Sequence, residues 1–157
     1  MRPLIIAANW KMNTTPADAG ELAATIAART EEPGVVRVIC PPFVCLAAVR
    51  DALAGKNVAV GAQNVHHELA GAYTGEISAA MLDGLATWVI VGHSERRRDA
   101  HESDELIGKS WPVQSHPACA RSSASASCWP SVKPVVPSRW WPLSSAAPWR
   151  ARTWTPF

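Results

Sequence analysis

Residues 110–157, the last 48 of the chain, contain no acidic residue and no glycine, although the whole sequence has 13 acids and 9 glycines. The same segment holds six of the 8 tryptophans and eight of the 13 prolines. Its net charge is +5, against −3 for residues 1–109. Prolines at this density interrupt any helical or alternating pattern, so we expect an irregular tail after a regular first part.

The chain also lacks the patterns of targeting, membrane insertion and metal binding. Its start is not a basic segment followed by an apolar stretch, and no window has the roughly 20 apolar residues of a membrane span. The cysteines have neither zinc-ligand spacing nor a disulfide pattern. We therefore expect a soluble, cytoplasmic protein without a metal site and with four reduced thiols, at Cys40, Cys45, Cys119 and Cys128.

Within residues 1–109, short apolar runs alternate with segments of helical periodicity. The runs predict four strands, at residues 4–8, 35–39, 58–60 and 88–91. Thr15-Pro16 supplies an N-cap and a first-turn proline for a helix with Ala19, Leu22 and Ile26 on its apolar face. A second helix follows Pro41-Pro42 and presents Leu46, Val49 and Leu53, and a short third one covers Ser78–Leu85.

Four strand-helix units in succession predict an α/β protein with a parallel sheet and right-handed crossovers. An open doubly wound sheet and half of a closed (β/α)₈ barrel both fit, because periodicity does not distinguish them. No GxGxxG follows the first strand, which argues against dinucleotide binding.

Polar side chains follow three of the expected strands. Asn9 and Lys11 come after the first, Gln63 and Asn64 after the third, and His93 to Glu95 after the fourth. A lysine beside a carboxamide can bind an anion, and a neutral histidine at a helix amino end can donate a hydrogen bond to a carbonyl. The set therefore suggests a phosphorylated carbonyl substrate.

Each of these residues alone also fits a structural role. His93 fits a surface turn, Lys11 a solvated lysine, Asn9 a turn residue and Arg96–Arg98 a solvated helix face.

Four sequence motifs decide between these interpretations, because they occur together and in order. They are ANWKMN at residues 8–13, GAQN at 61–64, GAYTGEIS at 71–78 and VGHSERR at 91–97. In order and separation they resemble the triosephosphate isomerase family. The resemblance covers about residues 3–109 and implies the first four units of a (β/α)₈ barrel, with residues 110–157 as a Pro/Trp/Ser-rich tail outside it.

The resemblance also implies roles for individual residues. Asn9 and Lys11 would bind substrate, His93 would be the neutral electrophile that polarises its carbonyl, and Glu95 would position Lys11, with Ser94 in the turn beside them. In the family the loop around Tyr73–Glu76 reaches into the second subunit of a homodimer, so three residues would support that interface or the partner's site: Thr74, Gln63 and Asn64.

The implied reaction interconverts dihydroxyacetone phosphate and glyceraldehyde 3-phosphate through an enediolate, without metal or organic cofactor. The family's general base is a glutamate in a motif similar to AYEPVWAIGTG, followed by a lid and glycine-rich phosphate loops, and the sequence contains none of these. A placed base contributes typically 10²- to 10⁴-fold. We therefore expect this chain to lack normal isomerase activity.

A shift of reading frame explains the composition of the tail. Tryptophan has the single codon TGG and proline codons begin with CC, so a Trp-Pro pair read from the third base gives alanine. In that frame residues 125–135 permit a string that resembles the segment after the family's fifth strand. We place a one-base shift between about Lys109 and Trp111, and coding DNA whose alternative frame lacks the missing glutamate would exclude it.

Two further hypotheses belong to other functional classes. A half-barrel exposes open strand edges that recruit other chains, which indicates a non-catalytic interaction module or an unstable product. The tryptophan- and arginine-rich tail could in principle contact a membrane interface or single-stranded nucleic acid. Because it lacks the periodicity of an interfacial helix, we expect neither a membrane nor a nucleic acid as a partner.

Overall fold

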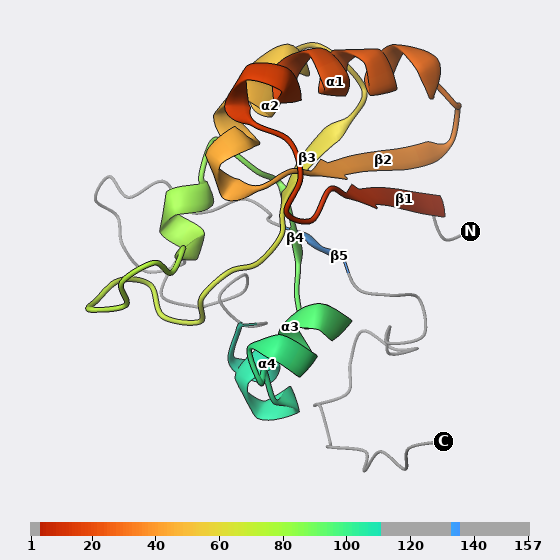
Figure 1. Ribbon diagram of the computed structural model, residues 1–157. Helices are drawn as coiled ribbons and strands as arrows, with labels where there is room; N and C mark the ends of the chain where they lie inside the picture. The colour runs from red at the N-terminus through yellow and green to blue at the C-terminus, as the bar shows by residue number, and fades with distance from the viewer. Residues whose placement is uncertain (1–3, 111–132, 136–157) are drawn as a thin grey trace, which may run out of the picture.

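The computed structural model describes residues 4–110 and 133–135 of the 157-residue chain. Its strands form one curled parallel sheet in the order β1-β2-β3-β4-β5 (Figure 1). The strands are β1 Leu4–Asn9, β2 Val35–Cys40, β3 Ala59–Ala62, β4 Trp88–Ile90 and β5 Lys133–Val135. The first four, with their helices, confirm the half-barrel that the sequence predicts.

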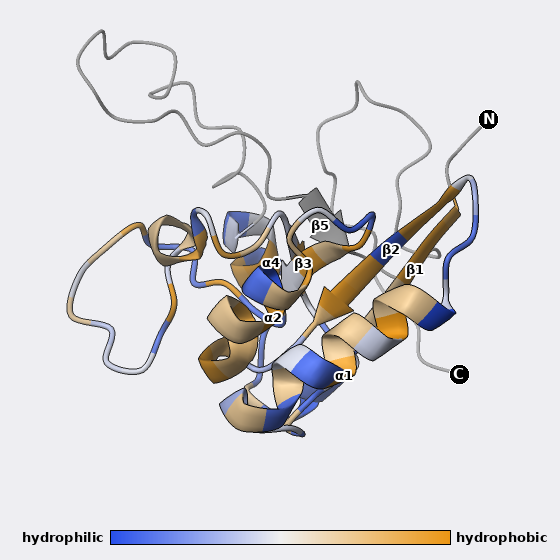
Figure 2. Cartoon of the chain, turned by 90° about the horizontal axis from the view of Figure 1, so that it is seen from above, coloured by the Kyte–Doolittle hydropathy of each residue, from blue (hydrophilic) through white to orange (hydrophobic). Residues whose placement is uncertain are grey.

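The helices follow the strands in alternation. They are α1 Pro16–Arg29, the 3₁₀ turn η1 Phe43–Cys45, α2 Leu46–Ala52, the 3₁₀ turn η2 Ala79–Leu82, α3 Ser94–Asp99 and α4 Asp104–Ser110. α1 and α2 lie side by side over one face of the sheet, and α3 and α4 follow β4 (Figures 1 and 2). The helix expected over Ser78–Leu85 is reduced to η2, because Asp83 returns to extended backbone with ψ of 134°.

The apolar face expected for α1 is wrong in one position. The buried residues are Ala19, Ala23 and Ala27, whereas Leu22 remains 40% exposed. Positions four apart form one row along a helix, and Leu22 lies about 100° around the helix from Ala23, the middle residue of that row. A methyl group on Gly20 would lie 3.6 Å from the Ala48 carbonyl oxygen of α2. Small residues thus allow the two helices to pack closely.

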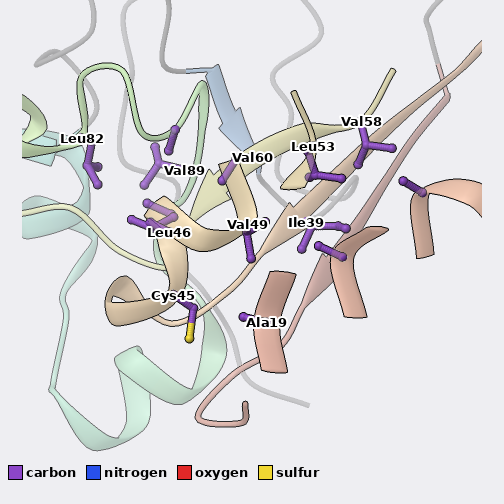
Figure 3. Packing of buried hydrophobic residues seen from close by; sticks show 14 of the residues in the cluster. Ala19, Ile39, Cys45, Leu46, Val49, Leu53, Val58, Val60, Leu82 and Val89 are labelled. Atoms are coloured by element: carbon purple, nitrogen blue, oxygen red, sulfur yellow. The ribbon is translucent and has the colours of Figure 1, made fainter. Parts of the chain in front are cut away.

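The main hydrophobic core lies between the sheet and these helices (Figure 3). Leu46, Val49 and Leu53 share the buried face of α2, as predicted, and pack in one cluster with Ile39 of β2. Successive residues of a strand point to opposite faces, so Val38 and Cys40 belong to a second cluster on the other face of the sheet.

Arg37 is a buried cation on the helix-facing side of β2, with 8% of its surface exposed. Its guanidinium donates to the Ala27 carbonyl oxygen at 3.1 Å, to Thr30 Oγ1 at 3.2 Å and to the Asn57 carbonyl oxygen at 2.9 Å. Arg37 therefore joins the end of α1 to the turn before β3 with hydrogen bonds to neutral acceptors.

β5 is an element that the sequence pattern did not indicate. Its three residues pair in parallel with β4, with Trp88 opposite Lys133 and Ile90 opposite Val135. The other expectations for the tail, its irregular fold and its shifted frame, fall on residues outside the described ranges. Among the residues that the structure describes, no helix is long and apolar enough to cross a membrane.

Candidate active site

A cavity of about 210 Å³ opens at the carboxyl ends of the strands. Six residues singled out in the sequence line it, from the ends of β1, β3 and β4: Asn9, Lys11, Gln63, Asn64, His93 and Glu95. The carboxyl ends of parallel strands meet at one edge, which is where ligands bind in such sheets. The topology thus brings together side chains up to 86 positions apart in the sequence.

The backbone at Lys11 has a conformation that is unusual for a residue with a side chain. Its φ is +55°, in the left-handed region. The Lys11 N–H donates to Asn9 Oδ1 at 2.9 Å, and Gln63 Nε2 donates to the Lys11 carbonyl oxygen at 2.8 Å and to the Cys40 carbonyl oxygen at 2.9 Å. Such conformations persist where surrounding contacts fix them. Asn9 and Gln63 therefore set the direction of the lysine side chain.

Lys11 and Glu95 form an ion pair across the cavity, with Nζ 2.5 Å from Oε1. The hydrogen bond from Lys11 is the largest of the effects that lower the pKa of Glu95, and the Lys11 charge adds to it. Glu95 is therefore an anion at neutral pH and a weak base. Both side chains remain partly exposed, at 52% and 40%, so a ligand can reach them.

His93 occupies the turn between β4 and α3 and caps the helix. Its Nδ1 accepts the Glu95 N–H at 3.3 Å, and the Glu95 Oε2 atom lies 3.6 Å from Nδ1. An imidazole that accepts a hydrogen bond at one nitrogen carries its proton on the other in the neutral form. The Nε2–H is then a donor, and in the described part of the chain no hydrogen bond uses it.

Two residues of α4 support the turn between β4 and α3, Ile107 by contact and Asp104 through Arg97. Gly92 has φ of +65°, and a Cβ built on it would lie 2.8 Å from Ile107 Cδ1. Arg97 Nε donates to the Gly92 carbonyl oxygen at 3.0 Å, while its Nη1 lies 2.6 Å from Asp104 Oδ1. One glycine, one isoleucine and one ion pair therefore fix the residue that precedes His93.

Thr74 lies apart from the cavity, in the exposed loop between β3 and η2. In that loop Tyr73 packs on His66 with ring centroids 4.5 Å apart, and His66 packs on His67 at 4.4 Å. Within the described ranges, no group of three or more His, Cys, Asp or Glu side chains could hold a metal ion.

Comparison with known proteins identifies this arrangement. The family model described as triosephosphate isomerase matches residues 4–116. The chain belongs to the triosephosphate isomerase family. Curated relatives named triosephosphate isomerase include those of Clostridium botulinum strain Loch Maree, 49% identical over 110 residues, and Dehalococcoides mccartyi, 44% identical over 110 residues. The one from Carboxydothermus hydrogenoformans is 49% identical over 111 residues. Each comparison covers 69% of this chain and 44% of the relative.

The chain thus spans less than half the length of the triosephosphate isomerases that it matches. The family model ends at residue 116, seven positions beyond the boundary expected at 109. The residues of the family's site that this chain carries follow β1, β3 and β4.

Three residues that line the cavity were not selected from the sequence: Met12, Phe43 and Arg96. Phe43 follows the second strand, so its position at a strand end was a usable signal. The interpretation of the arginines as a solvated helix face is wrong for two of them. Arg96 pairs with Glu102 at 2.5 Å and Arg97 with Asp104, and both are half-buried, whereas Arg98 is 73% exposed.

Proposed function

We propose that this cavity binds a small phosphorylated carbonyl compound, either dihydroxyacetone phosphate or glyceraldehyde 3-phosphate. The observation that carries the proposal is the Lys11–Glu95 pair beside the Nε2–H of His93, in one cavity. An ammonium group has three donors and Lys11 uses one for Glu95, so two can bind substrate oxygens. Asn9 fixes the lysine backbone, and His93 donates to the carbonyl that acquires negative charge in an enediolate.

We propose further that the chain binds the substrate but isomerises it much more slowly than full-length members of its family. Formation of the enediolate requires a base that removes a proton from the carbon beside the carbonyl. Glu95 is the one carboxylate that lines the cavity in the described residues, and its pKa is lowered by Lys11. A carboxylate held in an ion pair is poorly suited to take that proton, and no metal or organic cofactor is needed for binding.

Titration of the purified chain with dihydroxyacetone phosphate tests both statements. We expect binding that is lost in Lys11→Met and retained in Lys56→Met, because Lys56 lies on an exposed turn after α2 and outside the cavity. We also expect isomerisation at least 10²-fold below that of a full-length relative. Equal binding by the two variants would refute the proposed role of Lys11 in binding. Isomerisation at the rate of a full-length relative would refute the claim that the chain lacks the general base.

We extend the proposal to a homodimer in the cytoplasm, where the reaction of the family serves glycolysis and gluconeogenesis. Thr74 would approach the site of the partner subunit, and Gln63 and Asn64 would support the interface between the two subunits. Exposed apolar side chains favour it, since Leu69 is 62% and Tyr73 45% exposed in this loop, and Met12 is 95% exposed near Lys11. Loss of the dimer on Thr74→Arg, measured by light scattering, would support this interface.

A second candidate function is a non-catalytic interaction module. The observation that favours it is the edge of the sheet at β1, where Leu4, Ile5 and Ile6 remain 61%, 38% and 57% exposed. Parallel sheets normally bury both faces. This function would be favoured over the first if the chain self-associates but does not bind phosphorylated ligands, and if these ligands leave its oligomeric state unchanged.

A further inference from the structure

The strand β1 ends the sheet, and in the described part of the chain no other strand pairs with its outer edge. We propose that this edge binds the same edge of a second copy of this chain, in antiparallel orientation about a two-fold axis at Ile6. The proposal deepens the interaction-module function and rests on it, and it is independent of ligand binding at Lys11. Its support comes from the backbone and the side chains of β1.

The hydrogen bonds of β1 to β2 determine which backbone groups point outward. Trp10 N–H donates to the Cys40 carbonyl oxygen at 3.0 Å, and Ala8 is in register with Ile39. Alternate residues of a parallel strand direct both N–H and C=O to the same neighbour. Residues 4, 6, 8 and 10 therefore bond to β2, whereas Ile5 and Ala7 direct their N–H and C=O groups away from the sheet.

These outward groups are self-complementary. If Ile6 lies on the two-fold axis, Ile5 of one copy is opposite Ala7 of the other, and each such pair exchanges two hydrogen bonds. Four backbone hydrogen bonds then join residues 4–8 of the two copies. A register shifted by one residue would place outward groups opposite inward ones, so the backbone excludes it.

The side chains of β1 fit the same arrangement. Ile6 is in register with Arg37, whose guanidinium reaches the α1 carbonyl of Ala27, so Leu4 and Ile6 lie on the helix-facing side of the sheet. Ile6 then meets the second copy's Ile6 directly, and Leu4 meets the second copy's Ala8. The residues with the largest exposure in the strand are thereby covered.

Residues 4–9 carry none of the features that protect exposed strands, and the nearest proline is Pro3, just before the strand. Proteins block such edges with lysine, proline, bulges or inward-pointing charge. β1 has the sequence LIIAAN, six residues without charge or proline, and it pairs with β2 without interruption. Residues 4–8 of two copies can therefore pair without repulsion between like charges.

The symmetry of the edge favours a second copy as the occupant. The outward groups of Ile5 and Ala7 match across a two-fold axis, and both strands then present the same uncharged, apolar side chains. α1 and α2 lie on one face of the sheet (Figure 2), and a two-fold axis normal to the sheet keeps α1 and α2 of both copies on that face. The result is one continuous sheet covered on one side by helices.

Amide hydrogen exchange of the unmodified chain, measured by NMR over a range of protein concentrations, tests the proposal. The Ile5 and Ala7 amides should exchange more slowly as concentration rises, roughly tenfold when monomer falls to about a tenth of the chain. The Ile6 and Ala8 amides bond to β2 and serve as internal controls, which should not change. Concentration-independent exchange at Ile5 and Ala7, or equal slowing at all four positions, would overturn the proposal.

Disulfide crosslinking tests the two-fold axis independently, in a background with Cys119→Ser and Cys128→Ser. Directly opposed residues of a non-hydrogen-bonded pair have Cα atoms about 4.5 Å apart, within disulfide range. Ile6→Cys should therefore form a linked dimer. Leu4→Cys is the matched control on the same face, because the two copies of residue 4 would lie about 13 Å apart along the strands.

Rapid linkage of Ile6→Cys and none of Leu4→Cys would support the proposed register. Linkage of both variants at equal rates, of Leu4→Cys alone, or of neither would exclude it. Pairing of β1 with β5 of another copy would also leave Ile6→Cys unlinked. Binding of dihydroxyacetone phosphate, measured on the same samples, keeps this result separate from the proposed ligand site.

Discussion

Replacement of Gly92 by alanine should destabilise the chain in two separable ways. The left-handed φ of +65° costs a residue with a Cβ about 1–2 kcal/mol. The added methyl would also lie 2.8 Å from Ile107 Cδ1 and 3.3 Å from Cγ1 and Cγ2. Overpacking of this kind costs about 1–3 kcal/mol. We therefore expect Gly92→Ala to lower the free energy of unfolding by about 2–5 kcal/mol.

Gly84→Ala is a matched control for the backbone term. Gly84 has φ of +67°, and a Cβ on it would meet nothing within 4 Å. Its replacement should cost only about 1–2 kcal/mol. With a urea m-value of about 1–3 kcal/mol/M, an additional 2 kcal/mol at Gly92 lowers the unfolding midpoint by roughly 1 M relative to Gly84→Ala.

Ile107→Val isolates the steric term, because it deletes the Cδ1 atom that makes the closest approach. Alone it should cost about 0.5–1.5 kcal/mol. Combined with Gly92→Ala, the loss should be smaller than the sum of the two single losses by about 1 kcal/mol. Equal midpoints for Gly92→Ala and Gly84→Ala, or simple additivity in the double variant, would refute the proposed contact between α4 and the His93 turn.

Three further predictions concern charge and burial. Arg37→Met should lower the free energy of unfolding by about 2–3 kcal/mol in urea titrations, because buried carbonyl oxygens lose a charged donor, whereas Arg29→Met at the exposed end of α1 should change little. The lowered pKa of Glu95 means that its pairing with Lys11 stabilises the fold above the ordinary value of 4.5 and is lost as pH falls through the lowered pKa. Carboxyl ¹³C NMR should show that Glu95 titrates below pH 4.5, and Lys11→Met should return the pKa of Glu95 towards 4.5. Burial raises the pKa of Cys40 to about 12, so iodoacetamide at pH 8.5 should label this thiol only after unfolding, and labelling of the native chain would contradict its burial.

The strands and the cavity were predictable because both depend on local pattern and on one topological rule. β1 and β2 begin where their apolar runs begin, and each extends one residue beyond the expected end. Parallel topology then brings the ends of β1, β3 and β4 together, which places Lys11, Glu95 and His93 in one cavity. The identities of the polar residues were visible in the sequence before their distances were known.

The misses arise where tertiary packing overrides pattern. The apolar run predicts that the third strand ends at residue 60, but β3 continues through Ala62. Gly61 lies inside the strand where a side chain has no room, because a methyl on it would lie 2.6 Å from Cys40 Sγ. A glycine that permits close strand packing has the same pattern as one that begins a turn. Leu22 is left half-exposed because the alanines of α1 form the packed row.

The hydrogen bonds that the Gln63 side chain makes to backbone carbonyl oxygens could not be predicted from the sequence. Gln63 was assigned to an interface by family resemblance, and the structure shows its amide holding Lys11 and Cys40 carbonyl oxygens. No residue pattern encodes those acceptors, because every residue has a carbonyl group. The interface role of Gln63 stays a prediction beside this positioning role.

The strand order has a consequence for synthesis on the ribosome. Because β1, β2, β3 and β4 are neighbours in the sheet as well as in the sequence, each strand emerges beside a partner that has already been made. Contacts between near neighbours form quickly, and chains fold from the amino end as they emerge. We expect Asn9, Lys11 and His93 to come together while the residues after Ser110 are still being translated, so that β5 pairs with an edge of β4 that is already in place.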